Sequence, residues 1–71
     1  MWTIQFNYDI DAYVPCLILS LTHNSSNNTT KLLFINPKEQ FGTHNFDSAK
    51  MSEYVSDDII EIMKLIDTLN A

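Results

Sequence analysis

The C-terminal quarter of the chain constrains the fold most, because its apolar residues recur at helical spacing. No glycine or proline interrupts the sequence after Ser48. At about 100° per residue, seven apolar side chains fall within an arc of roughly 160°. They are Val55, Ile59, Ile62, Met63, Leu65, Ile66 and Leu69. A helix docked on one small sheet needs a stripe of only about 100°. The pattern therefore predicts a C-terminal amphipathic helix with apolar surface to spare.

The expected helix runs from about residue 56 to residue 69. Ser56 is a good N-cap, and carboxylates at the next two positions, Asp57 and Asp58, favour the positive end of the helix dipole. Met51 extends the apolar stripe backward, so a helix start near residue 48 is the alternative. Ile60 lies outside the apolar arc and is expected at the surface.

A strand over residues 2–8 is indicated by Trp2, Ile4, Phe6 and Tyr8, which alternate with polar residues. This period of two is typical of a half-buried strand with one face turned to the core. Its aromatic content adds to the strand preference.

Two further strands are expected at residues 13–21 and 31–36, where apolar residues follow one another almost without interruption. Pro15 cannot donate a ladder hydrogen bond, which predicts that the second strand starts at a sheet edge or a bulge. The polar residues 22–30 between the two strands are expected to form a loop. Residues 38–55 stay open between loop, edge strand and helix, with a short strand around residues 41–46 as one option.

Together these elements predict one α+β domain spanning residues 1–71. A three-stranded, mainly antiparallel sheet, in the order strand, strand, strand, helix, is packed on one face by the C-terminal helix. One helix cannot cover both faces of two strongly apolar strands. Apolar surface should therefore remain on the sheet or beside Ile60.

The charge of the chain disfavours two classes of partner. Nine Asp and Glu residues against four lysines and no arginine give a net charge of −5, which repels nucleic-acid phosphates and an anionic membrane surface. The longest apolar run, Cys16 to Leu19, is far shorter than the roughly 20 residues that span a bilayer. With a single cysteine and no recognisable secretory signal, the expected location is the reducing cytoplasm.

Few residues carry the patterns of a catalytic, metal or cofactor site. Cys16, inside an apolar strand, is expected to be a buried core thiol. His23 and His44 fall in polar segments expected to be loops, and they lack the spacing of a zinc site. The pair Asp9 and Asp11 is typical of a turn. No catalytic residue, metal ligand or cofactor is expected.

Three carboxylates, Glu53, Asp57 and Glu61, follow one another at i, i+4 and would lie roughly 6 Å apart along one helix face. The main interpretation is a solvated face partly balanced by Lys50 and Lys64. A sharper hypothesis is an acidic stripe that competes with nucleic acid for a basic groove on another protein.

The favoured function is a non-catalytic protein-protein interaction module. It would act as an accessory subunit of a larger complex, or as an inhibitor, for example a viral or phage protein, that occupies a partner's functional surface. The partner is another protein or a second copy of this chain. Candidate contact residues are Ile60, Leu65, Glu53, Asp57 and Glu61. The alternative is a small enzyme or ligand-binding protein with a site across a dimer interface, built on His23 and His44.

Overall fold

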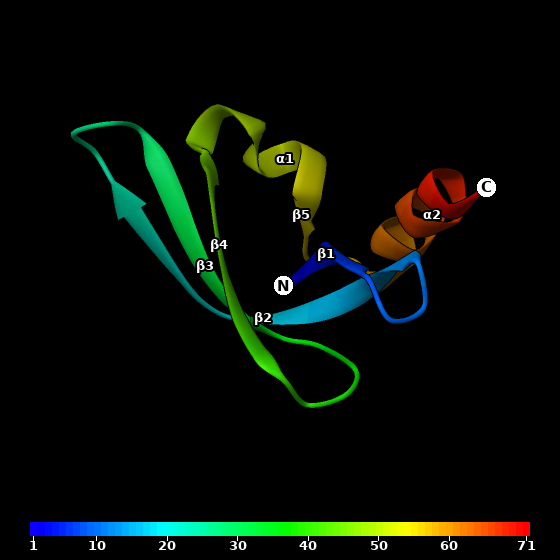
Figure 1. The fold of residues 1–71 in the computed structure, drawn as a ribbon. Helices are drawn as coiled ribbons and strands as arrows, with labels where there is room; N and C mark the ends of the chain where they lie inside the picture. Colours follow the sequence, from blue (N-terminus) through cyan, green and yellow to red (C-terminus); the bar gives the residue numbers. More distant parts are fainter.

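A five-stranded sheet with order β4-β3-β2-β1-β5 forms the centre of the protein, and all neighbouring strands are antiparallel (Figure 1). The computed structural model describes residues 1–71. The strands are β1 (Trp2–Asn7), β2 (Ala12–Asn24), β3 (Thr29–Ile35), β4 (Phe41–Asp47) and β5 (Val55–Ser56). The helical segments are η1 (Ser48–Lys50), α1 (Met51–Tyr54) and α2 (Ile59–Asn70). Neither α1 nor α2 has the length and apolarity of a membrane-crossing helix.

The expected α+β class, antiparallel sheet and C-terminal helix are confirmed, but the count of three strands is wrong. β4 lies in the region 38–55 that the sequence left open, and it pairs with β3 along its whole length. The expected polar loop 22–30 is also too long. β2 continues to Asn24 and β3 begins at Thr29, so only a four-residue turn separates them. Backbone pairing extends these strands beyond their apolar residues.

The start of the C-terminal helix also differs from the expectation. Val55 and Ser56 belong to β5, where they pair with Thr3 and Trp2 of β1. α2 begins at Ile59, and the Asp58 carboxylate caps it by accepting a hydrogen bond from the Ile60 N–H at 2.9 Å. A continuous helix from residue 48 is excluded because η1 and α1 end before β5.

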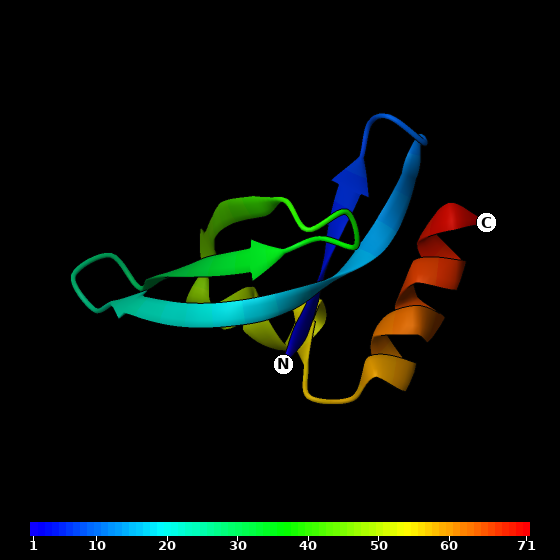
Figure 2. The ribbon, with the colours of Figure 1, turned by 90° about the horizontal axis from the view of Figure 1, so that it is seen from below.

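β2 gives the sheet its curvature, because its two halves pair with different neighbours. Residues 12–17 pair with β1 and residues 17–24 pair with β3, so only Leu17 has a partner on both sides. The register with β3 shifts between Ile18 and Ser20, as at a β-bulge. Figure 2 shows β2 sweeping in an arc from the β1 hairpin to the β3 hairpin.

The curved sheet carries two small cores on opposite faces. On one face α2 buries Ile4 against Ile62 and Ile66. On the other face the segment from η1 to β5 covers a second cluster of Leu32, Phe46 and Val55. Successive residues of a strand point to opposite faces. Neighbouring residues at the β1 end of the sheet therefore serve different cores.

Asn70 of α2 fastens the helix to the free side of β2. Its Oδ1 accepts a hydrogen bond from the Tyr13 N–H at 2.8 Å, and its Nδ2 donates to the Tyr13 carbonyl at 3.1 Å. The backbone groups of Tyr13 therefore point away from β1. Because this direction repeats every second residue, Pro15 also turns its nitrogen to the side where β2 has no strand partner. The edge position predicted for Pro15 is confirmed.

Ser48, the first residue of η1, links the η1–β5 segment that covers the second core to the sheet. Its Oγ lies 2.7 Å from Oγ1 of Thr30 and 3.1 Å from Nδ1 of His23. Thr30 is only 2% exposed, so its hydroxyl depends on this contact for a partner. The hydroxyl of Ser48 thus fixes where η1 begins on the β2–β3 hairpin.

Replacing Ser48 by Ala should lower the free energy of unfolding by about 1 to 3 kcal/mol, because the Thr30 hydroxyl is left buried without a partner. Urea denaturation measures the change. The exposed Ser52→Ala serves as a matched control and should change stability little. In a Thr30→Val background the Ser48→Ala cost should shrink, and an equal cost in both backgrounds would contradict this role.

Candidate functional site

The side of β1 opposite β2 is only partly covered. β5 pairs with Trp2 and Thr3 and then ends, so Ile4–Asn7 have no strand partner on this side. Phe6 is paired with Tyr13, whose backbone groups point away from β1 to Asn70. In an antiparallel ladder both members of such a pair turn their N–H and C=O outward. The N–H and C=O of Phe6 therefore face the open edge.

Two adjoining cavities lie along this open edge, and both are lined by Gln5 and Phe6. The larger, of about 320 Å³, lies between the β1–β2 and β3–β4 hairpins and is also lined by Val14 and Phe34. The smaller, of about 170 Å³, extends toward α1. Its lining includes Leu32, His44, Phe46 and Tyr54. We call the two cavities together the β1 groove.

Near one end of the β1 groove, an ion pair joins two hairpin turns. Lys38, in the β3–β4 turn, places its Nζ 3.8 Å from Oδ2 of Asp9 in the β1–β2 turn. Both side chains are more than half exposed, so the pair adds little stability. The pair shows how far the sheet curls, because it brings the β1–β2 turn into contact with the β3–β4 turn on the other side of the sheet. The turn predicted for Asp9 and Asp11 is confirmed.

The floor of the groove depends on a cross-strand pair of Phe34 and Gly42. A Cβ atom on Gly42 would lie 2.5 Å from Cζ of Phe34, which is too close for any side chain. The only glycine of the chain thus lets the far end of the Phe34 ring approach the backbone of β4 closely. A larger residue at position 42 would push the ring into the groove.

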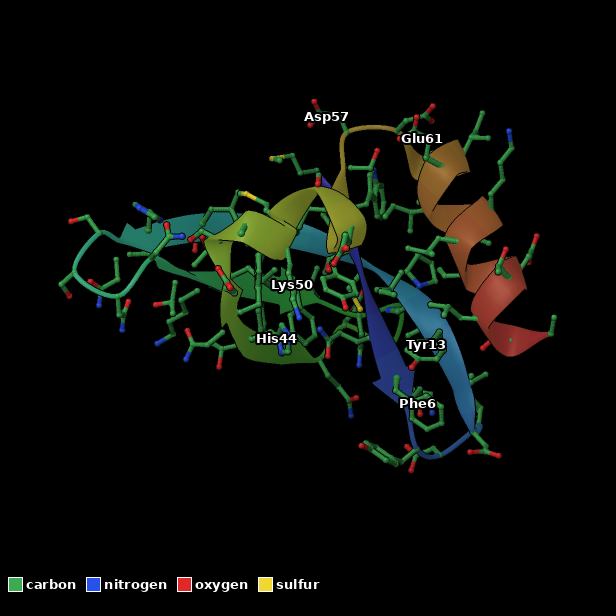
Figure 3. The ribbon with its side chains drawn as sticks, turned by 90° about the horizontal axis from the view of Figure 1, so that it is seen from above. Phe6, Tyr13, His44, Lys50, Asp57 and Glu61 are labelled. Atoms are coloured by element: carbon green, nitrogen blue, oxygen red, sulfur yellow. The ribbon has the colours of Figure 1, made fainter.

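The walls of the groove combine aromatic and amide side chains. The Phe6 ring makes edge contacts with Tyr8 and Tyr13 at centroid distances of 5.0 and 5.1 Å. In the view of Figure 3, Phe6 and Tyr13 lie together toward the β1–β2 turn, while His44 and Lys50 lie on the other side of β1. The side-chain amide of Gln5 makes no hydrogen bond within the protein. The lining therefore places apolar surface beside side-chain amides that can both donate and accept hydrogen bonds.

The two apolar candidates from the sequence have different surroundings. Ile60 is 62% exposed on α2, as the spacing predicted. Leu65 is half-buried and packs against the cluster of Ile4, Ile62 and Ile66, so part of its surface is already used by the fold. Neither residue lines the β1 groove.

The three carboxylates do not form the helical row that the sequence predicted. Glu53 lies in α1, Asp57 in the connection after β5, and Glu61 in the first turn of α2. The row is broken because β5 interrupts the helix. All three remain exposed, and Figure 3 shows Asp57 and Glu61 close to the turn that leads into α2. The Ser56 hydroxyl donates to Glu61 at 2.8 Å.

The two histidines lie on strands, so the expectation that they occupy loops is wrong. His23 is in β2 and His44 is in β4, with β3 between these strands. His44 stacks on Phe46 with a centroid distance of 5.9 Å. The structure brings no three His, Cys, Asp or Glu side chains together in a metal-binding arrangement.

Strands β2, β3 and β4 carry the second core on one face of the sheet, and a further apolar surface lies on their opposite face. Leu17, Ile35 and Phe41 form one cross-strand row there. Phe41 is 69% exposed and Leu17 is 38% exposed. The sequence analysis predicted uncovered apolar surface on the sheet, but it did not identify Phe41, because a strand over residues 41–46 was only one of the options it left open.

The β1 groove itself was not among the sequence predictions, since its lining comes from four strands, two hairpin turns and α1. Comparison with protein-family models, with curated proteins and with solved structures finds no match for this chain.

Cys16 is fully buried, which confirms the predicted core thiol. Burial disfavours the thiolate and raises the pKa of Cys16 from its ordinary value of 9.0 to about 11. A thiol held in its neutral form is a poor nucleophile. Cys16 therefore contributes packing to the sheet rather than reactivity.

The raised pKa predicts a loss of stability at alkaline pH. Between pH 9.0 and about 11 the unfolded thiol is ionised and the folded one is not, so unfolding releases a proton. This group should lower the free energy of unfolding by up to about 1.4 kcal/mol per pH unit across that window, and no further above it. Urea denaturation at several pH values measures the slope. Cys16→Ala should show a shallower slope, and identical slopes would contradict the assignment.

Proposed function

We propose that this chain is a non-catalytic protein-binding module and that its partner docks at the β1 groove. The observation that carries this proposal is the open edge of β1 at Phe6, next to cavities lined by apolar side chains. An unpaired strand edge is a template for pairing with another chain. Natural sheets usually cover or charge such edges, and here Ile4–Asn7 carry no charge.

The charge of the protein favours a basic partner. A net charge of −5 attracts proteins of opposite charge and speeds their encounter, and it opposes association with nucleic acid or with further acidic proteins. The exposed carboxylates Glu53, Asp57 and Glu61 would act in this long-range attraction rather than as one helical stripe. In this role the chain is an accessory subunit of a larger complex, or an inhibitor that occupies its partner's surface.

The first test is recovery of the partner with a groove-filling variant. The side chain of Gln5 is half-buried, lines both cavities and makes no hydrogen bond in the protein, so Gln5→Arg places a long charged side chain in the groove without breaking a side-chain hydrogen bond. We expect at least about tenfold less partner in affinity purification from the source cells, equivalent to roughly 1.4 kcal/mol. Thr22→Arg, at an exposed β2 position outside both groove cavities, is the matched control and should recover the wild-type amount.

A third variant separates the groove from the helix surface. Ile60→Glu adds a charge to the exposed side of α2 and should leave recovery unchanged if the partner occupies the groove. Loss of the partner with Ile60→Glu but not with Gln5→Arg would move the binding surface to α2. Failure of the wild-type chain to recover any protein in a stoichiometric complex would overturn the proposed function.

A further inference from the structure

We infer that the partner contributes an extended segment that adds a strand to β1, with apolar side chains at alternate positions pointing into the groove. This inference rests on the proposed function and names the partner's binding element. The recognised chemistry is a polypeptide backbone together with two apolar side chains.

β5 is the first reason, because it already uses the same edge of β1. Val55 and Ser56 pair with Thr3 and Trp2 in an antiparallel register. The residue before Val55 is Tyr54, which already belongs to α1, so the pairing along β1 stops there. The edge thus accepts a strand in the structure itself. A partner segment beside Phe6 would continue that strand along β1 past the point where the chain's own residues leave.

The direction of the backbone groups is the second reason. The N–H and C=O of Phe6 face the open edge, as its pairing with Tyr13 requires. A partner residue placed opposite Phe6 would exchange two hydrogen bonds with it. Strand addition of this kind takes its affinity from main-chain hydrogen bonds and its specificity from pockets for alternate side chains.

The lining of the groove sets the side-chain requirement. Partner residues on either side of the one opposite Phe6 would project to the same sheet face as Gln5 and Asn7. There the larger cavity presents Val14 and Phe34. Its volume of about 320 Å³ is near the lower limit of ligand pockets, which suits single side chains and not a folded element.

The charge argues for a segment of another protein over a second copy of this chain. Self-association would bring together two bodies that each carry a net charge of −5. A segment from a basic protein meets no such repulsion. The segment itself should be uncharged at the positions that face Val14 and Phe34, because these side chains offer no counter-charge. Asp9 is the one charged residue in the lining of that cavity, and it is already paired with Lys38.

The test uses heptapeptides selected from a random phage-displayed library against the immobilised full chain. Selected peptides should show apolar residues at every second position. In titrations followed by NMR they should shift the amide signals of Ile4–Asn7. N-methylation of the peptide nitrogens that face β1 should weaken binding at least about tenfold, as for a lost backbone hydrogen bond, while N-methylation at the alternate positions should not.

Two protein variants complete the test. Gly42→Ala pushes the Phe34 ring into the groove and should weaken peptide binding at least about tenfold. Thr43→Ala, at the neighbouring exposed position of β4, should leave the affinity unchanged. Circular dichroism and thermal melting of both variants show whether Gly42→Ala is folded. If it is not, the paired N-methylation series on the wild-type chain decides alone.

The outcomes separate the binding mode from the proposed function. Peptides that tolerate both N-methylation patterns, or that shift α2 signals around Ile60, would overturn strand addition and leave protein binding standing. A library that yields no binder, or a concentration-dependent dimer with shifts at Ile4–Asn7, would also overturn it. Strand addition would be supported only by the one-sided N-methylation effect together with shifts on β1.

Discussion

The pairing of one long strand with two different neighbours is the constraint on which the rest of the structure depends. β2 changes partner at Leu17, and the register shift after Ile18 bends the sheet at that point. The bend leaves one flank of each half of β2 without a strand. It also brings the β1–β2 and β3–β4 turns within reach of each other, as the contact of Lys38 with Asp9 shows. The two cores and the groove all follow from this geometry.

A bent sheet with a core on each face is a costly arrangement for 71 residues. Each cluster has only three buried apolar side chains, and the partly buried residues around them do much of the covering. A domain of this size buries only about 60% of the surface of its unfolded chain. Individual polar contacts at the borders, such as Ser48 with Thr30, therefore carry a large share of the stability.

Elements with a clear hydrophobic period could be predicted from the sequence, whereas elements that form only by pairing with a neighbouring strand could not. The alternation from Trp2 to Tyr8 correctly predicts β1, and the missing N–H of Pro15 correctly predicts an edge. β4 has only two apolar residues, at positions 41 and 46, and forms because β3 offers it an edge. Val55 fits the helical stripe by spacing, yet it pairs with Thr3. The groove could not be predicted, because it depends on the curvature that brings distant segments together.

The contact between Asn70 and Tyr13 has a consequence for how the chain is made. Fifty-seven positions separate the two residues. During synthesis the hairpin of β1 and β2 emerges long before α2, so the backbone groups of Tyr13 stay without this partner while the residues between are being added. Until then β2 presents its own open edge, with the same capacity for pairing as the edge of β1. A nascent chain of this protein thus exposes the edge of β2 at Tyr13 in addition to the edges of β1 and β4 that stay open in the folded protein, and docking of α2 removes this additional edge.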